Sequence, residues 1–307
     1  MSQAIHRMLV VIIFLGSMLT QGATAEETSQ KTVAMVNGKP ISAEQIQLQF
    51  FLDSIPQEAG SEARKKLLNE LIDRELIRQD LVTRKIAASP EKLDHQISVV
   101  QKIITRQGKQ LDDILSRLHL TQSSLREVLA LPLAWDTYVR SVTTDQQLRE
   151  YWRKHRIELD GTRVQAAQIV RILPRTAAEA EWQAAEKLLV DVKTEIESGA
   201  KTFAAAAEKI SQSPSAQRGG DLGTFEFRGR VDEAISRVAF STPAGQISAP
   251  FRTRFGIHLI EVRKVIPGQL SLEDVREEIF SRLNKQLWDQ QVQELRKKAR
   301  IQMTETN

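Results

Sequence analysis

The stretch Phe203–Phe225, FAAAAEKISQSPSAQRGGDLGTF, joins an alanine-rich segment to a glycine-rich one. The alanines through Ile210 predict a short helix, because alanine has the highest helix propensity. The Ser-Gln-Ser-Pro-Ser sequence that follows is typical of a turn, and Gly219, Gly220 and Gly223 permit backbone conformations that other residues resist. The glycine run lacks the Lys-Ser/Thr pair of a phosphate-binding loop, which excludes that type of site.

Mixed secondary structure surrounds this stretch. Residues 164–172 and 258–263 alternate like strands, whereas 177–198 and 232–240 have the periodicity of helices. The order is strand, helix, helix, glycine turn, helix, strand. We therefore predict an α+β fold for the segment 162–265.

The segments on both sides are helical in pattern. After a short strand at 32–36 and an Asn-Gly turn, residues up to 160 are almost all predicted to be helix, with Ser42 and Thr121 as two of the caps. The last helix, 272–299, has an apolar face that needs a partner. We expect this helix to dock on residues 32–155, so that the α+β domain is inserted into a helical one.

Composition excludes several classes of function. The 307 residues allow two domains, and the net charge of +4 comes from acids and bases that are interleaved, which argues against nucleic-acid binding. Because the chain has no cysteine, disulfides, thiolate chemistry and a lipid-modified cysteine are excluded. Its 5 histidines are scattered without metal-ligand spacing. We expect neither a metal nor a cofactor.

The N-terminus has the pattern of a secretory signal. His6 and Arg7 give a short positive region, and the apolar run Met8–Leu19 is too short to span a bilayer comfortably. The small residues Ala23 and Ala25 flank Thr24, so we predict cleavage after Ala25. The alternative is an uncleaved membrane anchor.

Three ordered blocks resemble the parvulin (PpiC-type) peptidyl-prolyl isomerases. The first is Phe203–Phe225, the second is TPAGQISAPF at 242–251, and the third is FGIHLIEV at 255–262. In addition, VNGKPIS at 36–42 resembles the opening of SurA-like and PrsA-like exported chaperones. Together the blocks cover about a hundred residues in the family's order.

The resemblance implies a parvulin-like mixed sheet with surrounding helices, inserted in a mainly α-helical chaperone-like domain. It assigns residues 1–25 to the signal peptide, 26–160 to the SurA-N-like domain, 161–266 to the parvulin domain and 267–307 to the docking helix.

The same resemblance implies a candidate site. The family's sheet usually carries two histidines; His258 matches the second, whereas Gln168 stands at the first, and Ser213 stands where a Cys or Asp is common. His258 could instead be a core histidine, Gln168 a tolerated substitute or a sign of lost activity, and Ser213 a turn residue. The apolar wall of the proline pocket would be formed by Leu222, Phe225, Val231, Ile235 and Phe240.

The implied function is a folding factor that isomerises X–Pro bonds of unfolded or exported polypeptides. The alternatives are a holding chaperone with a weak or inactive parvulin fold, and an assembly factor for one partner. We expect the protein in the periplasm, without a stable membrane anchor after signal cleavage and without nucleic-acid partners. Client proteins, the preference for the residue before proline and the oligomeric state are not encoded in recognisable motifs.

Overall fold

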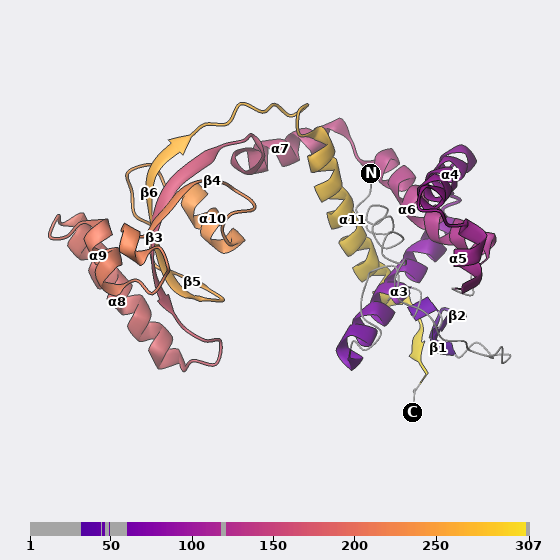
Figure 1. The fold of residues 1–307 in the computed structure, drawn as a ribbon, viewed down its shortest axis with the longest axis horizontal. Helices are drawn as coiled ribbons and strands as arrows, with labels where there is room; N and C mark the ends of the chain where they lie inside the picture. Colours follow the sequence, from indigo (N-terminus) through magenta and orange to yellow (C-terminus); the bar gives the residue numbers. More distant parts are fainter. Residues whose placement is uncertain (1–31, 44, 47–48, 50–59, 118–120, 305–307) are drawn as a thin grey trace. The chain divides into compact units, whose positions relative to one another are not determined.

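The computed structural model describes residues 32–43, 45–46, 49, 60–117 and 121–304. The predicted signal peptide, its cleavage site and part of the helix predicted after Ser42 lie outside these residues. The chain consists of two compact units. The first combines residues 1–144 with 281–307, and the second is 145–280. Figure 1 shows the elements of each unit, which are described separately below.

A four-stranded sheet with the order β4-β3-β6-β5 forms the centre of the second unit. Its strands are β3 (Arg163–Ile172), β4 (Asp221–Glu226), β5 (Phe251–Thr253) and β6 (Gly256–Ile266). The α+β class is confirmed. All three pairings in this sheet are antiparallel, so the sheet is not mixed as the resemblance implied.

The two faces of this sheet support separate apolar clusters. Helices α8 (Glu179–Glu197) and α9 (Phe203–Ile210) cover one face, where Ile169 and Leu259 are buried. Helix α10 (Glu233–Ser241) covers the other, over Val164 and Ile260. Side chains alternate between the faces of a strand. The even-numbered residues of β3 and β6, including Gln168 and His258, therefore share the face that α10 covers.

Several elements of the second unit differ from those predicted: β5 was not predicted, and β6 is longer than the predicted strand 258–263. Strand β4 begins at Asp221, inside the segment that we predicted to be only a glycine turn, because its residues pair with β3. Helix α11 (Arg276–Lys298) begins after the predicted start at Leu272. The Asp274 carboxylate accepts bonds from both the backbone and the hydroxyl of Ser271, which forms a separate turn.

The first unit contains a small sheet with the order β2-β1-β7, formed by β1 (Thr32–Val36), β2 (Lys39–Ser42) and β7 (Ile301–Met303). Helix α3 (Ser61–Thr83) packs on it through Ile72 and Leu76. Strand β7 was not predicted, since three residues give no periodicity. It pairs with β1 and so brings both ends of the described chain into one sheet.

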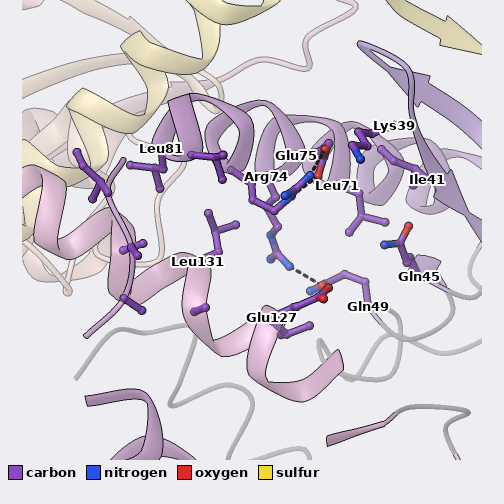
Figure 2. A pocket seen from close by; sticks show the side chains of 18 of the residues that line it. Lys39, Ile41, Gln45, Gln49, Leu71, Arg74, Glu75, Leu81, Glu127 and Leu131 are labelled. Carbon is purple, nitrogen blue, oxygen red and sulfur yellow. Dashed lines mark hydrogen bonds and ion pairs between the residues drawn. The ribbon is translucent and has the colours of Figure 1, made fainter. Parts of the chain in front are cut away.

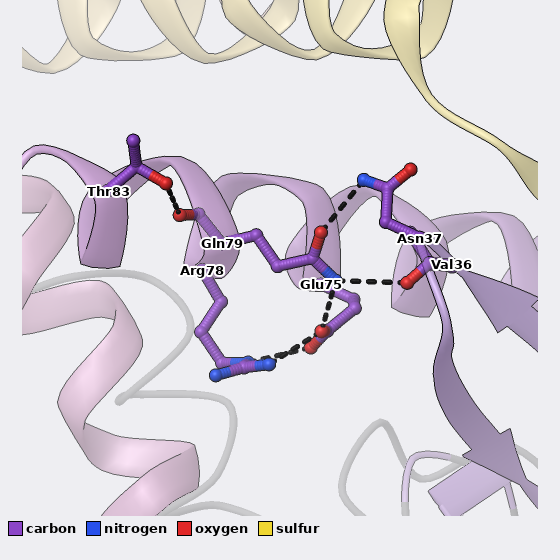
Figure 3. A network of polar contacts seen from close by, with 6 residues as sticks. All are labelled: Val36, Asn37, Glu75, Arg78, Gln79 and Thr83. Atoms are coloured by element: carbon purple, nitrogen blue, oxygen red, sulfur yellow. Dashed lines mark hydrogen bonds and ion pairs between the residues drawn. The ribbon is translucent and has the colours of Figure 1, made fainter.

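A polar network fixes the turn between β1 and β2 against α3 (Figure 3). Asn37 has φ 50°, a conformation that Asn tolerates better than most residues. Its amide nitrogen donates to Gln79 Oε1 at 2.8 Å, and Gln79 Nε2 donates to the Val36 carbonyl at 3.0 Å. The Asn37 side-chain oxygen accepts the backbone N–H of Arg300 at 2.8 Å. One turn residue thus connects the sheet, α3 and the C-terminal segment.

The remaining helices of the first unit are α4 (Pro90–Arg106), α5 (Leu111–Arg117) and α6 (Gln122–Val142). Thr121 caps the start of α6 as predicted, and the structure shows that it forms a capping box with Ser124. Trp135 on α6 donates its indole N–H to Asn284 at 3.0 Å and stacks edge-on against Trp288 at 5.1 Å. The part of α11 after Phe280 therefore contacts α6 within this unit.

Helix α7 (Asp145–Leu159) belongs to the second unit. Asp145 at its start pairs with Arg276, and the carbonyl of Asp160 just after its end accepts the backbone N–H of Leu270 at 2.9 Å. No helix in the described part of the chain combines the length and the apolar character needed to cross a bilayer.

Candidate functional site

His258 lies on β6, on the face of the sheet that α10 covers, and its side chain is almost completely enclosed. The residue is 3% exposed. Its Nε2 lies 2.8 Å from the hydroxyl oxygen of Thr253, and its Nδ1 lies 3.4 Å from Oε1 of Gln168. The ring of Phe251, the cross-strand neighbour of His258, stacks on the imidazole with centroids 5.5 Å apart.

These bonds determine which imidazole nitrogen carries the proton. The Gln168 oxygen can only accept, so Nδ1 of His258 donates to it. A neutral imidazole then accepts at Nε2, and the Thr253 hydroxyl donates there. The Thr253 oxygen in turn accepts the backbone N–H of Phe255 at 3.0 Å. The hydrogen-bonded chain runs from Phe255 through Thr253 and His258 to Gln168.

The imidazole is held in its neutral form. Burial lowers the pKa of His258 to about 4, and the negative charge of Asp232 opposes this shift. Asp232 lies at the start of α10, where it accepts the backbone N–H of Ala234 and pairs with Arg254 at 3.0 Å. At neutral pH the site therefore offers hydrogen bonds and not a cationic acid.

Gln168 is positioned by the register between β3 and β6, where it pairs with Ile260. On the other edge of β3, its backbone N–H donates to the Gly220 carbonyl at 2.9 Å. Gly220 has φ +78°, and a Cβ there would lie 2.3 Å from the Gln168 carbonyl oxygen. Glycine at this position thus allows the close approach of the loop to the strand that carries Gln168.

Ser213 is buried in the loop after α9 and is part of a chain of serines. Its hydroxyl lies 2.8 Å from that of Ser215 and 3.2 Å from that of Ser211, which accepts the Val170 backbone N–H at 3.1 Å. The bonds of Ser213 among the described residues do not reach His258 or Gln168. This geometry supports the role of a turn residue that holds the loop on β3.

The predicted apolar wall is one continuous cluster. Phe225 and Ile235 are buried in it, whereas Leu222, Val231 and Phe240 are partly exposed at its edge. The rings of Phe225 and Phe240 lie 6.1 Å apart. Phe251 packs on the same cluster and also on His258, and it therefore links the wall to the polar floor.

Sequence reasoning did not select Thr253, Phe251 or Asp232 as site residues. Phe251 ends the second quoted block, which was a usable signal, but Thr253 follows the block and lies in no motif. Both positions become informative only when β5 pairs with β6 and places Phe251 opposite His258.

The site has the chemistry of a hydrogen-bonding floor beside an apolar wall. Within the residues that the structure describes, no group of three or more His, Asp or Glu side chains is arranged to hold a metal ion. The residues brought together are His258, Gln168 and Thr253, next to the apolar cluster. Such a site can bind and orient an apolar ring and its amide.

Two family models match the chain. A PPIC-type PPIASE domain matches residues 169–264, and a SurA-like N-terminal domain matches residues 2–138. Together they cover more than half of the sequence. The first range contains His258 and the five residues of the predicted apolar wall but begins one residue after Gln168.

Curated relatives resemble nearly the whole chain. Foldase protein PrsA of Clostridium botulinum (strain Loch Maree / Type A3) is 22% identical over 92% of this chain and 91% of that protein. Foldase protein PrsA of Bacillus subtilis (strain 168) is 26% identical over 78% of this chain and 76% of that protein.

A solved structure shares the fold. The crystal structure of Peptidylprolyl Isomerase (PrsA) from Bacillus cereus superposes with a TM-score of 0.51 at 18% identity, covering 91% of this chain and 96% of that chain. The chain therefore contains a PpiC-type PPIase domain, and a SurA-like N-terminal domain precedes it.

Proposed function

We propose that this protein is an exported folding factor that isomerises X–Pro bonds in unfolded polypeptides. The observation that carries the proposal is the neutral, hydrogen-bonded His258 between Gln168 and Thr253, directly beside the apolar cluster. The match to the isomerase family and the likeness to two foldases support it. We also propose that 161–266 acts as the isomerase domain and that 267–307 completes the helical domain formed by 26–160.

The physical demand of the reaction fits such a site. Rotation about a peptide bond has a barrier of about 18–20 kcal/mol, because the C–N bond has partial double-bond character. A catalyst needs no covalent step if it binds the twisted amide more tightly than the planar one. Each 1.36 kcal/mol of such preference gives about a tenfold faster rate.

Each group in the site has a proposed role in this differential binding. The partly exposed edge of the apolar cluster, including Leu222 and Phe240, would hold the proline ring. His258 and Gln168 would form the polar floor beneath the amide, and a neutral imidazole avoids the cost of burying a charge. Ser213 would position the loop on β3 and would not contact the amide.

The location of the protein is proposed from its N-terminus. We infer that residues 1–25 direct export and are removed after Ala25, which would release the protein into the periplasm. N-terminal sequencing of the mature protein tests this, with Glu26 as the expected first residue. A retained N-terminal segment would contradict it.

A prolyl isomerisation assay on a short X–Pro peptide, with an aggregation assay beside it, tests the activity. We expect the purified protein to accelerate isomerisation, and we expect His258→Ala to lower kcat/KM. Suppression of aggregation without any acceleration would support the inactive holding chaperone instead. Unchanged kcat/KM in His258→Ala would show that the site assignment is wrong even if the protein is an isomerase.

A further inference from the structure

A pocket in the first unit is lined by none of the residues proposed for isomerisation. It is formed by β2, α3, the loop after α3 and the first half of α6, with a volume of about 580 Å³. Figure 2 shows the side chains that surround it. Most of the lining is apolar, including Ile41, Leu71, Leu81, Val82, Ile86, Val128 and Leu131.

One cation in the pocket is already matched by carboxylates. The Arg78 guanidinium donates two bonds to Glu75, at 2.7 and 2.6 Å. The carboxylates of Glu75 and Glu127 raise the pKa of Arg78, although its partial burial opposes them. Arg78 therefore already has a carboxylate partner.

The hydrogen-bond partner of Arg74 is a neutral group. Arg74 is half-buried, and its guanidinium donates to the neutral amide oxygen of Gln49 at 2.5 Å. Among the residues that the structure describes, no carboxylate forms an ion pair with Arg74. A guanidinium beside apolar side chains binds a carboxylate more strongly than a neutral group, because solvent screens the pair less. The lining carries three cations, with Lys39 as the third, against two anions, which also favours an anionic ligand.

Apolar groups lie on both sides of Arg74. Leu81 and Leu131 lie on one side of its side chain, and Leu71 and Ile41 on the other (Figure 2). Along α3, Leu71 and Leu81 are separated by about 15 Å, given the rise of the helix. An extended chain covers this distance with about four or five residues. Along the pocket, the lining therefore changes from apolar to cationic at Arg74 and back to apolar.

We propose that this pocket binds an extended polypeptide segment in which one Asp or Glu is flanked by apolar residues, with the carboxylate on Arg74. The inference rests on the proposed function, because the ligand is an unfolded polypeptide. The residues that would bind it are different from those proposed for isomerisation. Binding here would hold a client in place independently of its prolines. The carboxylate comes from a side chain and not from a chain end, since apolar groups extend on both sides of Arg74.

Fluorescence anisotropy with labelled peptides and the full-length protein tests the proposal. The probe is acetyl-Ser-Leu-Val-Glu-Leu-Phe-Ser-amide, which has no proline and one carboxylate. A second peptide has Gln in place of Glu, and a third has this Gln and a free C-terminal carboxylate. We expect the Glu peptide to bind about tenfold more tightly than the other two, as for a charge-assisted hydrogen bond.

Variants assign the preference to the pocket. Arg74→Gln is expected to remove the preference for Glu, and Arg74→Lys to keep part of it. Val82→Ser, at an exposed position of the lining, is expected to weaken both the Glu and Gln peptides about equally. Arg126→Gln is the matched control, because Arg126 is an exposed arginine of α6 outside the lining and should change nothing.

Three results would each overturn the proposal: equal affinity of wild type for the Glu and Gln peptides, an unchanged preference in Arg74→Gln, or equally tight binding of the peptide with the free C-terminus. The isomerisation assay distinguishes a failure of this proposal from a failure of the proposed isomerase function. Arg74→Gln should turn over a short X–Pro peptide like the wild type. If the wild type has no isomerase activity, the anisotropy measurement still tests the preference for the Glu peptide.

Discussion

The hydroxyl oxygen of Thr253 lies 2.8 Å from Nε2 of His258, and this bond joins the end of β5 to the middle of the site. The hydroxyl also accepts the backbone N–H of Phe255, so the short turn between β5 and β6 holds it in place. The turn therefore positions the hydroxyl that bonds to Nε2 of His258, whereas the Gln168 oxygen sets which ring nitrogen carries the proton.

The first prediction concerns this hydroxyl. Thr253→Val keeps the side-chain shape but removes the donor to His258, so we expect kcat/KM for a short X–Pro peptide to fall about tenfold, as for the loss of one hydrogen bond. Circular dichroism should be unchanged. The control is Thr194→Val on α8, whose hydroxyl bonds only within its own helix. Wild-type activity in Thr253→Val would show that this hydrogen bond is not important for turnover.

A second prediction uses the position of Gln168. In Gln168→Glu a carboxylate replaces the amide oxygen that lies 3.4 Å from His258 Nδ1. An adjacent negative charge stabilises the imidazolium, so the pKa of His258 should rise from about 4. NMR titration of the histidine ring signals measures this shift. An unchanged pKa of His258 in this variant would show that the side chain at position 168 does not lie next to the ring in solution.

The depressed pKa of His258 also predicts how stability depends on pH. The folded protein has a pKa of about 4 at this residue, against 6.5 for the ordinary side chain. Between these values the unfolded chain binds a proton that the folded chain does not, so stability falls as the pH decreases from 6.5 to 4. The total loss is about 3 kcal/mol.

Urea unfolding at several pH values measures this dependence, with His258→Asn as the comparison. The variant lacks the titrating group and should lose less stability over the same range. Parallel curves for the two proteins would contradict the prediction, because other groups would then cause the whole dependence.

A further prediction concerns the backbone beside Gln168. Gly220→Ala should destabilise the protein, because the new Cβ would lie 2.3 Å from the Gln168 carbonyl oxygen. Gly229→Ala is the matched control: its φ of +106° is also unfavourable for alanine, but nothing lies within 4 Å of its Cβ position. We expect Gly220→Ala to cost at least about 2 kcal/mol more in free energy of unfolding. Similar losses of unfolding free energy in the two variants would indicate that the loop at Gly220 can move away from β3 at little cost.

The last prediction concerns a buried hydroxyl on α10. Ser236 is 0% exposed, and its hydroxyl has no hydrogen-bond partner among the described residues. Ser236→Ala should therefore raise the free energy of unfolding by about 1 kcal/mol, because it removes an unsatisfied buried group. Ser241→Ala, at the exposed end of the same helix, should have little effect. A destabilised Ser236→Ala would reveal a partner for this hydroxyl.

Local patterns predicted most helices and their caps because the interactions that set them span a few residues. The Thr121 cap and the helix from Phe203 to Ile210 are confirmed at their predicted positions. Longer-range pairing was harder to predict. Strand β4 overlaps a glycine-rich segment with weak strand propensity, and it forms because β3 offers an unpaired edge.

The site was only partly visible in the sequence for the same reason. The motifs selected His258, Gln168 and the apolar wall, which the structure places on one face of the sheet. Ser213 was also selected, yet its bonds go to Ser211 and Ser215. Thr253 was missed because a single threonine outside a motif carries no signal until β5 pairs with β6.

The sequence by itself determined the family, the α+β class and the identity of the groups available for chemistry, since ordered motifs and residue types are local properties. The tertiary structure decided how the Thr253 hydroxyl bonds to His258, because that depends on strand register and on a turn. It also decided that His258 is neutral, because burial is a property of the packed domain. In the same way, only the packing of α3 against α6 and β2 reveals that Arg74 lies in an apolar pocket without a carboxylate partner among the described residues.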